Sequence, residues 1–176
     1  MSYFTKLPAK LPTIKMDLIN PGKSHVSIID SIYIIKLFDL PWSSEEIRLL
    51  QVWLQPHSYV PIHIDKDMIN LTYQLWGLLL PVENHTATTA RIYECIDDSK
   101  ISTMQYATGP IPYLDIENAR IVESHDISTG PAFFDSGKEW HGASNDTDYM
   151  QHCITIRSPT VPKQEIFDYL VKRWPL

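Results

Sequence analysis

The sequence contains little cysteine and little glycine: two cysteines, Cys95 and Cys153, and six glycines in 176 residues. Two thiols cannot form a disulfide framework or a four-thiolate zinc site, so we expect both to be small core residues in a reducing compartment. Both lie within predicted strands, whereas a catalytic thiol is typical of a helix N-terminus. The few glycines form no phosphate-binding loop, and no serine has the flanking glycines of a hydrolase nucleophile.

Positive charge is also scarce, because 15 basic residues stand against 21 acidic ones and the net charge is −6. No cluster of Lys and Arg occurs, so binding along a nucleic-acid backbone, which needs dense positive charge, is not expected. The most apolar early stretch, residues 28–40, is too short for a bilayer and contains charged residues. Residues 1–15 lack the apolar core of a signal peptide. We therefore expect a soluble cytoplasmic protein with neither a membrane nor a nucleic-acid partner.

What the sequence does contain is a series of short apolar segments separated by Pro, Asn, Asp and Gly. Strands at such spacing are typical of a sandwich or barrel. No repeat, low-complexity tract or linker divides the chain, so residues 1–176 are expected to form one domain. The predicted strands are His25–Ile29, Ile32–Phe38, Leu49–Leu54, Leu71–Leu80, Ala90–Ile96, Ala119–His125, Ala132–Phe134 and Tyr149–Arg157.

Two segments near the C-terminus show the clearest patterns. In residues 163–174, apolar side chains recur at every fourth position after Pro162, which predicts a helix packed across the outside of a sheet. In Tyr149–Arg157, apolar side chains alternate with small polar ones, and Arg157 ends the polar face. Such a face suits the interior of a ligand-binding barrel and equally a solvent-facing edge. Residues 84–90 and 108–115 are expected to be rim loops.

The segment Ile62-His63-Ile64-Asp65 places an imidazole and a carboxylate two residues apart. In an extended chain both side chains project to the same face, which is a geometry that chelates a metal. Two histidines and one carboxylate on one octahedral face are the ligands of non-haem iron oxygenases, so a second histidine from elsewhere would complete such a site. The alternative is a local hydrogen-bonded pair that holds no metal.

A second segment, around His141, connects this pair to a known family. The chain resembles the Fe(II)/2-oxoglutarate-dependent oxygenases, in particular aspartyl/asparaginyl β-hydroxylase-like proteins and hydroxylase-like proteins of bacteria and their phages. The resemblance covers Arg48 to Arg157. The residues that carry it are Pro56 in a turn before His63-Ile64-Asp65, the run Phe133-Phe134-Asp135-Ser136-Gly137-Lys138-Glu139-Trp140-His141-Gly142-Ala143-Ser144-Asn145, and the final strand that ends in Arg157.

The resemblance implies a mainly β fold: a double-stranded β-helix, a cupin-like jelly-roll barrel over about residues 48–157, with a C-terminal helix and few others. It also implies Fe(II) held by His63, Asp65 and His141, with 2-oxoglutarate as co-substrate. The activity it implies is that of a dioxygenase that hydroxylates a peptide side chain or a small molecule. A small-molecule or peptide substrate is then the expected partner.

In that family a basic residue binds the distal carboxylate of 2-oxoglutarate, a task that suits the planar guanidinium of arginine. Arg157 is the candidate here, and Gln151 shares its face by strand parity. Tyr73, on the strand predicted after Asp65, is a further candidate pocket residue, with core packing as the alternative. The sequence departs from the family pattern where Gln151 and Leu79 stand in place of basic or polar groups.

These departures leave two alternatives open. One is a jelly-roll binding or interaction protein without turnover, and the other is a cupin-type metalloenzyme that does not use 2-oxoglutarate. The remaining histidines have no comparable partners in the sequence and are assigned no chemistry. Among them, His57 lies in the turn after Pro56 and His152 on the apolar face of the last strand, where a hydrogen-bonded core histidine is expected.

Overall fold

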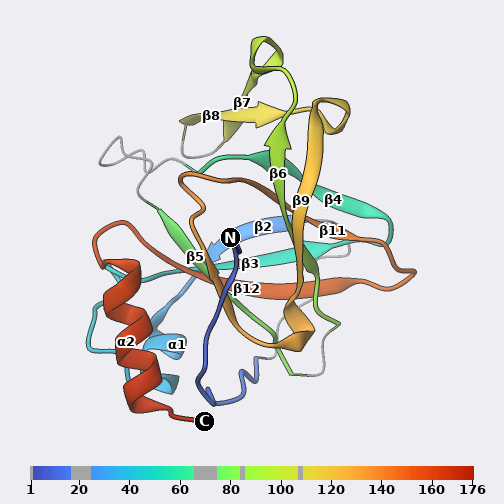
Figure 1. The fold of residues 1–176 in the computed structure, drawn as a ribbon. Coiled ribbons are helices and arrows are strands. Elements are labelled where there is room, and N and C mark those ends of the chain that lie inside the picture. Colours follow the sequence, from blue (N-terminus) through green and yellow to red (C-terminus); the bar gives the residue numbers. More distant parts are fainter. Residues whose placement is uncertain (1, 17–24, 66–74, 84–85, 107–108) are drawn as a thin grey trace.

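Strands predominate over helices in the computed structural model, which describes residues 2–16, 25–65, 75–83, 86–106 and 109–176 (Figure 1). The described helices are α1 (Ile32–Leu37) and α2 (Lys163–Arg173), with short 3-10 turns at η1 (Asp98–Lys100), η2 (Ile116–Asn118) and η3 (Ile127–Thr129). Neither described α-helix is long and apolar enough to cross a membrane. The described strands are β1 (Thr5–Lys6), β2 (His25–Ile29), β3 (Arg48–Leu54), β4 (Ser58–His63), β5 (Trp76–Leu80), β6 (Thr89–Cys95), β7 (Ser102–Tyr106), β8 (Gly109–Leu114), β9 (Ala119–Asp126), β10 (Ala132–Phe134), β11 (Trp140–Asn145) and β12 (Gln151–Ser158).

The strands form two antiparallel sheets, in the orders β1-β10-β5-β12-β3-β2 and β7-β8-β4-β11-β6-β9. Most consecutive strands of the barrel alternate between the sheets, so β12 lies between β3 and β5 while β11 lies between β4 and β6. If β3, β4, β5, β6, β9, β10, β11 and β12 are counted from 1 to 8, their orders are 6-3-8-1 and 2-7-4-5. This is the strand order of a double-stranded β-helix, and it confirms the predicted jelly-roll class.

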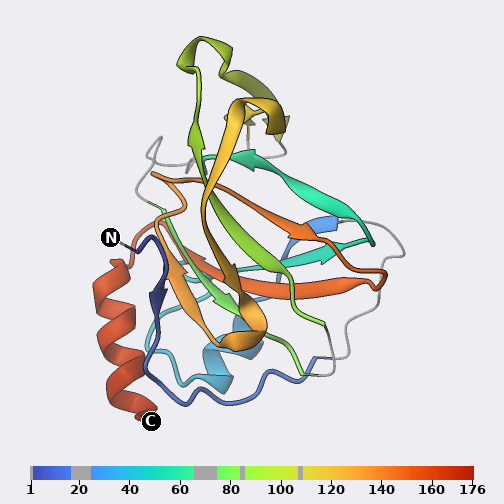
Figure 2. The same cartoon turned by 45° about the vertical axis from the view of Figure 1, so that its right-hand side comes forward.

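Alternation along β12 shows how the sheet separates its two faces. Ile154 and Ile156 are fully buried in a cluster on the outer face of the first sheet, where they pack with Ile166 and Leu170 of α2. Figures 1 and 2 show α1 and α2 together on this side of the molecule. The intervening residues Cys153, Thr155 and Arg157 face the space between the sheets. The predicted C-terminal helix and its packing are therefore confirmed.

One predicted strand is a helix. Residues 32–38 contain β-branched and aromatic residues, yet 32–37 form α1. Ile34 and Phe38, four residues apart, are both fully buried against the helical side of the first sheet, whereas Tyr33 and Lys36 are exposed. Asp30 accepts a hydrogen bond from the Ile32 N–H at 2.8 Å at the start of the helix. The burial of Ile34 and Phe38, which a helix places on one face, thus outweighs the preference of these side chains for strands.

A predicted rim loop is a strand. Within residues 108–115, Gly109–Leu114 form β8, which pairs with β7 along its length and with β4 at Ile62 and His63. Pro110 and Pro112 occupy alternate positions in register with β7, and β8 is bound to β4 only near its end, a location that tolerates proline. The predicted strand 71–80 is confirmed over 76–80, and residues 71–74 lie outside the described part of the chain.

Candidate metal centre

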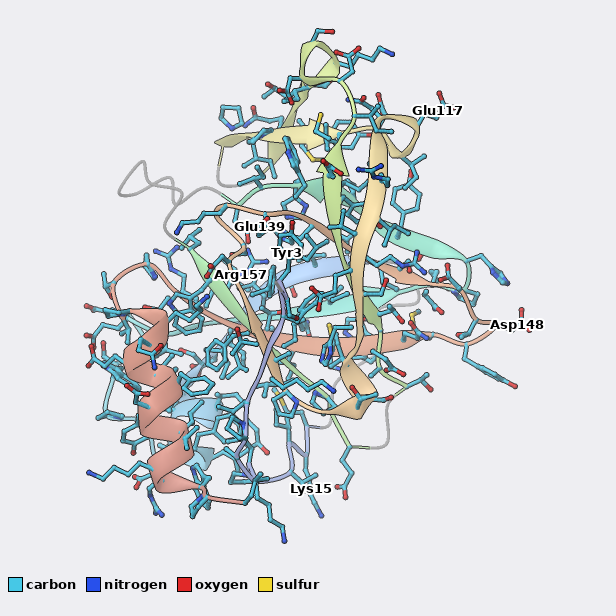
Figure 3. All side chains as sticks on the ribbon, viewed as in Figure 1. Tyr3, Lys15, Glu117, Glu139, Asp148 and Arg157 are labelled. Carbon is cyan, nitrogen blue, oxygen red and sulfur yellow. The ribbon has the colours of Figure 1, made fainter. Side chains whose placement is uncertain are left out.

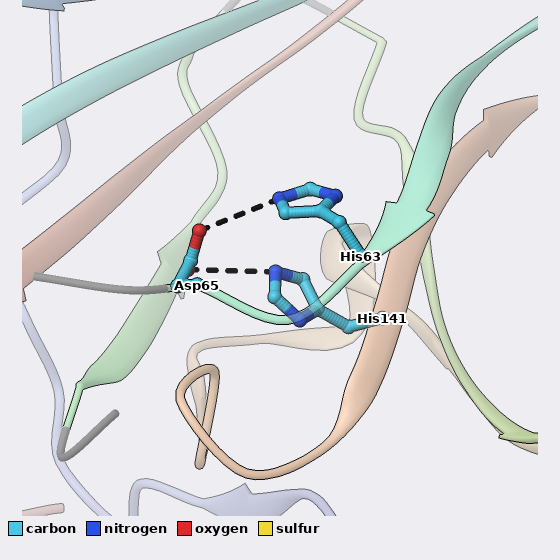
Figure 4. Close-up of side chains that lie close together, drawn as sticks. All are labelled: His63, Asp65 and His141. Atoms are coloured by element: carbon cyan, nitrogen blue, oxygen red, sulfur yellow. Dashed lines mark ion pairs between the residues drawn. The ribbon is translucent and has the colours of Figure 1, made fainter. Parts of the chain in front are cut away.

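Two neighbouring strands and a loop carry the three candidate ligands (Figure 4). His63 is the last residue of β4 and lies opposite His141 of β11 in the antiparallel register. Asp65 follows β4 by two residues, and its backbone N–H donates to the Ser136 carbonyl at 2.9 Å, which ties it to the turn before β11. The exposed fractions of His63, Asp65 and His141 are 6%, 8% and 6%. The strand pairing therefore places all three side chains in one buried cluster.

Backbone carbonyls orient both histidine rings. Nδ1 of His63 lies 2.7 Å from the carbonyl oxygen of Pro61, and Nδ1 of His141 lies 2.9 Å from that of Glu139. A carbonyl oxygen only accepts hydrogen bonds, so in the neutral ring Nδ1 carries the hydrogen and Nε2 carries the lone pair. Metal-ligating histidines typically have this second hydrogen bond, which fixes the tautomer and the ring orientation.

The two Nε2 atoms face the Asp65 carboxylate. Nε2 of His63 lies 3.4 Å from Oδ1, and Nε2 of His141 lies 3.5 Å from Oδ2. The Arg157 guanidinium forms an ion pair with Oδ2. Burial by itself raises the pKa of Asp65, but Arg157 and His141 outweigh that effect and hold the pKa well below its usual range. Burial, together with the nearby His63, lowers the pKa of His141, which favours the neutral imidazole.

This donor set fits a divalent metal. The ligand atoms of His63, Asp65 and His141 all lie within 4.8 Å of one another. Nε2 of His141 is buried and has no hydrogen-bond partner in the described part of the chain. Lone pairs of two imidazoles and an ionised carboxylate repel one another, and a cation among them converts this repulsion into coordination. Two histidines and one carboxylate suit non-haem Fe(II), and they also bind Mn(II) and Zn(II).

The cluster lines one end of a cavity of about 340 Å³ between the two sheets. Arg157 contributes to the same end, with only 18% of its side chain exposed, and Figure 3 shows it within the body of the molecule. By contrast, Lys15, Glu117 and Asp148 are drawn at its periphery. Thr155 and Cys153 line the cavity beyond Arg157, so the polar face of the last strand is a barrel interior rather than a solvent-facing edge.

The structure places Gln151 away from this cluster. Gln151 is buried at the other end of β12, opposite Leu54, and its Nε2 donates to Thr147 Oγ1 at 3.5 Å. Tyr73 lies outside the described residues. His152 is fully buried and its ring stacks on that of Trp53 with centroids 4.1 Å apart, in agreement with the expected core position. Of the candidate co-substrate residues, the described part of the chain brings only Arg157 to the three ligands.

Two residues that sequence reasoning did not single out shape the centre. The Phe134 ring meets the His141 ring edge-on, with centroids 5.0 Å apart and planes at 64°. Gly77 pairs with Phe134 in the sheet, and a Cβ at Gly77 would lie 2.9 Å from Phe134 Cζ. The glycine therefore gives the ring the room to lie beside His141. The Phe133-Phe134 run was part of the family resemblance, but no pattern in the sequence pairs it with Gly77.

Comparison with known proteins gives similarity in fold only. No known protein-family profile matches the chain, and no curated protein matches it in sequence. Similar solved structures include a Cupin_2 domain of an XRE family transcriptional regulator from Enterobacter cloacae, with 8% identity over 78% of this chain and 98% of the other and a TM-score of 0.37. A Klebsiella pneumoniae protein with a double-stranded β-helix domain has 9% identity over 81% and 82% of the two chains and a TM-score of 0.36. Oxalate decarboxylase from Bacillus subtilis has 12% identity over 88% and 34% and a TM-score of 0.38.

Proposed function

We propose that this protein is an Fe(II)-dependent dioxygenase that uses 2-oxoglutarate to hydroxylate a small molecule or a peptide side chain. The observation that carries the proposal is the buried cluster of His63, Asp65 and His141, in which both Nε2 atoms are turned toward the carboxylate. Two histidines and one carboxylate on one side of a metal leave coordination positions for co-substrate and oxygen. The cavity next to the cluster provides space for both ligands.

The residues of the chain have distinct tasks in this reaction. His63, Asp65 and His141 would hold the iron, which when bound supplies the activation of oxygen coupled to decarboxylation of 2-oxoglutarate. Pro61 and Glu139 keep the two imidazoles oriented through their carbonyls. Arg157 would bind a carboxylate of the co-substrate, since its guanidinium already lies at the metal end of the cavity. Phe134 packs against His141 and adds an apolar side chain to the cavity lining.

Anaerobic titration tests the proposal. Protein that holds Fe(II) and 2-oxoglutarate is expected to show a weak visible charge-transfer band, which should be lost in His63→Ala and in His141→Ala. His57→Ala is the matched control, because His57 is exposed and pairs with Asp148 away from the cluster. Absence of the band in wild-type protein, with circular dichroism showing an intact fold, would overturn the proposal.

A second function is favoured by one observation: Arg157 forms its ion pair with Asp65 itself. Farther along the same face of β12 come Thr155, Cys153 and Gln151, so this face offers no cation at a distance from the metal end. A cupin-type metalloenzyme that acts on an organic acid bound directly at the metal would need its cation at this position. Protein purified without chelator that contains stoichiometric metal but forms no succinate from 2-oxoglutarate would support this second function. A jelly-roll binding protein without turnover would neither form succinate from 2-oxoglutarate nor convert any other organic acid.

A further inference from the structure

The space between the sheets is an apolar chamber open to solvent. We define the inner chamber by six apolar residues that line the cavity: Leu50, Val52, Leu79, Ala90, Ile92 and Phe134. Phe134 and Ile92 border the metal end, because the first contacts His141 and the second lies opposite it in the strand register. Burial along β3 shows that the side chains of the described residues leave part of the chamber open. Leu50 and Val52 face the cavity and are only half-buried, whereas Leu49 and Trp53, which face the opposite side, are 0% and 2% exposed.

Along β3 and β12, charge is confined to one end of the cavity. Arg91 of β6 also lines the cavity, and its guanidinium is paired with Asp146. Arg48, Leu50 and Val52 are successive inward-facing residues of β3, and they lie in register opposite Arg157, Thr155 and Cys153 of β12. The two strands therefore present two guanidinium groups at the metal end, followed by two levels without charge. At about 3.3 Å per residue, the distance from the level of Arg48 to that of Val52 is about 13 Å.

The far end of the chamber offers a ligand little polarity. Phe4 and Ile127 line it, and both are buried. The two polar side chains at this level, Thr88 and Cys153, bond to each other, because the Thr88 hydroxyl donates to Cys153 Sγ at 3.3 Å. An apolar group at this end would therefore not disrupt the hydrogen bond between Thr88 and Cys153. A second carboxylate at this end would lose its hydration without gaining an ion pair.

We propose that the inner chamber binds the apolar tail of an amphipathic carboxylic acid whose carboxylate lies at Arg48. The inference rests on the proposed function and names its substrate class: a medium-chain alkanoic or arylalkanoic acid with its head at the metal end. Two guanidinium groups at that end allow a co-substrate carboxylate at Arg157 and a substrate carboxylate at Arg48. The inward face of β3 has a cation at one end, Arg48, followed by the apolar residues Leu50 and Val52. This arrangement favours a ligand with one carboxylate and an apolar tail over a free diacid or a peptide.

Calorimetric titration of the metal-free protein with straight-chain acids from butanoate to dodecanoate tests the inference. The dissociation constant should fall about fourfold for each added methylene until the chamber is full, and then level off. The 1-alkanols of equal length should bind more weakly than the acids. Arg48→Gln should remove this preference for acids and keep the dependence on chain length. A dissociation constant that does not change with chain length would overturn the inference.

Variants of the chamber wall locate the tail. Ala90→Phe should make the affinity level off at a shorter chain and leave butanoate binding unchanged. Val122→Phe is the matched control, because Val122 is exposed on β9 and does not line the cavity. If Ala90→Phe does not fold, Val52→Phe at a half-buried wall position provides the same test. Equal chain-length profiles for a folded wall variant and the control would place the acids elsewhere and contradict the inference.

The two proposals fail separately in these experiments. The binding series needs neither iron nor turnover, so a normal charge-transfer band with a flat chain-length series overturns only the substrate class. A steep chain-length series without any band of the iron and 2-oxoglutarate complex overturns only the dioxygenase.

Discussion

Single hydrogen bonds to the backbone decide how the two candidate histidine ligands present themselves. The carbonyls of Pro61 and Glu139 each accept from the Nδ1 of the histidine two positions later. The sequence predicted both histidines as ligands but not their tautomers, because the direction of a backbone carbonyl depends on the strand that contains it. The same reasoning applies to Arg157, whose proximity to Asp65 is visible only once β12 and the loop after β4 are placed.

The buried thiol of Cys153 leads to a pH-dependent prediction. Burial raises the pKa of Cys153 from its ordinary value of 9.0 to about 11, although the hydrogen bond from Thr88 opposes this shift. The folded state holds the proton more tightly, so the stabilisation is complete below about pH 9 and is lost as the pH rises through 11. In urea titrations we expect the wild-type free energy of unfolding to fall, relative to that of Cys153→Ala, by up to about 2.7 kcal/mol across this range.

Cys95 provides the control for that measurement, because it is only partly buried and lies on β6. Burial also raises the pKa of Cys95, but less than that of Cys153, so Cys95→Ala should retain most of the wild-type decline between pH 9 and 11. A difference between wild type and Cys153→Ala that stays constant with pH would show that Cys153 does not cause the effect.

The pairing of β5 with β10 sets the space beside His141. In Gly77→Ala, the new methyl group would press on the Phe134 ring and push it toward the His141 ring. The centroids of these two rings are 5.0 Å apart. We expect a loss of about 1–3 kcal/mol in stability by urea titration, together with weaker Mn(II) binding by calorimetry. The double variant Gly77→Ala/Phe134→Leu removes the collision and should recover part of the stability. No recovery in the double variant would count against this steric explanation.

The end of β11 is connected to its neighbours through one amide. Asn145 is fully buried, and its Nδ2 lies within hydrogen-bond distance of the carbonyls of Leu54, Gln55 and Tyr149, at 3.1, 2.9 and 2.6 Å. Asn145→Ala removes the donor that these three carbonyls share and should lower the free energy of unfolding by about 1–3 kcal/mol in urea. Asp148→Ala, in the same turn with an exposed side chain, should change it by less than about 0.5 kcal/mol. Equal effects of the two variants would contradict the structural role of the amide.

The elements that sequence patterns identified are those with strong alternation or four-residue spacing. The predictions for β12 and α2 were confirmed because each has an apolar face that is buried, with Ile154 and Ile156 on β12 and Ile166 and Leu170 on α2. The strands β4 and β11, which hold both histidines, were not predicted as strands. Pro61 interrupts the first and Gly142 the second, and a Cβ at Gly142 would lie 2.9 Å from the Val60 carbonyl oxygen. The irregularity needed to bring β4 and β11 together at the ligands thus weakened the signal of both strands.

The whole barrel should be stabilised by the metal that its centre fits. Mn(II) that binds the folded but not the unfolded chain raises the free energy of unfolding by about 2.7 kcal/mol at a concentration of 100 times its Kd. For a chain of this length the melting temperature should rise by about 5–11 °C in a thermal unfolding experiment followed by circular dichroism. His141→Ala should show no such rise, and His57→Ala should show the full one. A metal-independent melting temperature in wild type would argue against a site at His63, Asp65 and His141.

The order of the residues along the chain was enough to indicate a mainly β jelly roll, the outward packing of the C-terminal helix, and His63, Asp65 and His141 as the candidate ligands. The helix follows from its four-residue periodicity, and the pairing of His63 with Asp65 follows from their spacing. The jelly roll and the addition of His141 to the ligand set follow from the family resemblance. The tertiary structure decided the rest: the helix at 32–37, the separation of Gln151 from the centre, the contact of Arg157 with Asp65, and the apolar chamber. Each of these depends on contacts between segments that are distant in sequence, and local sequence alone does not specify those contacts.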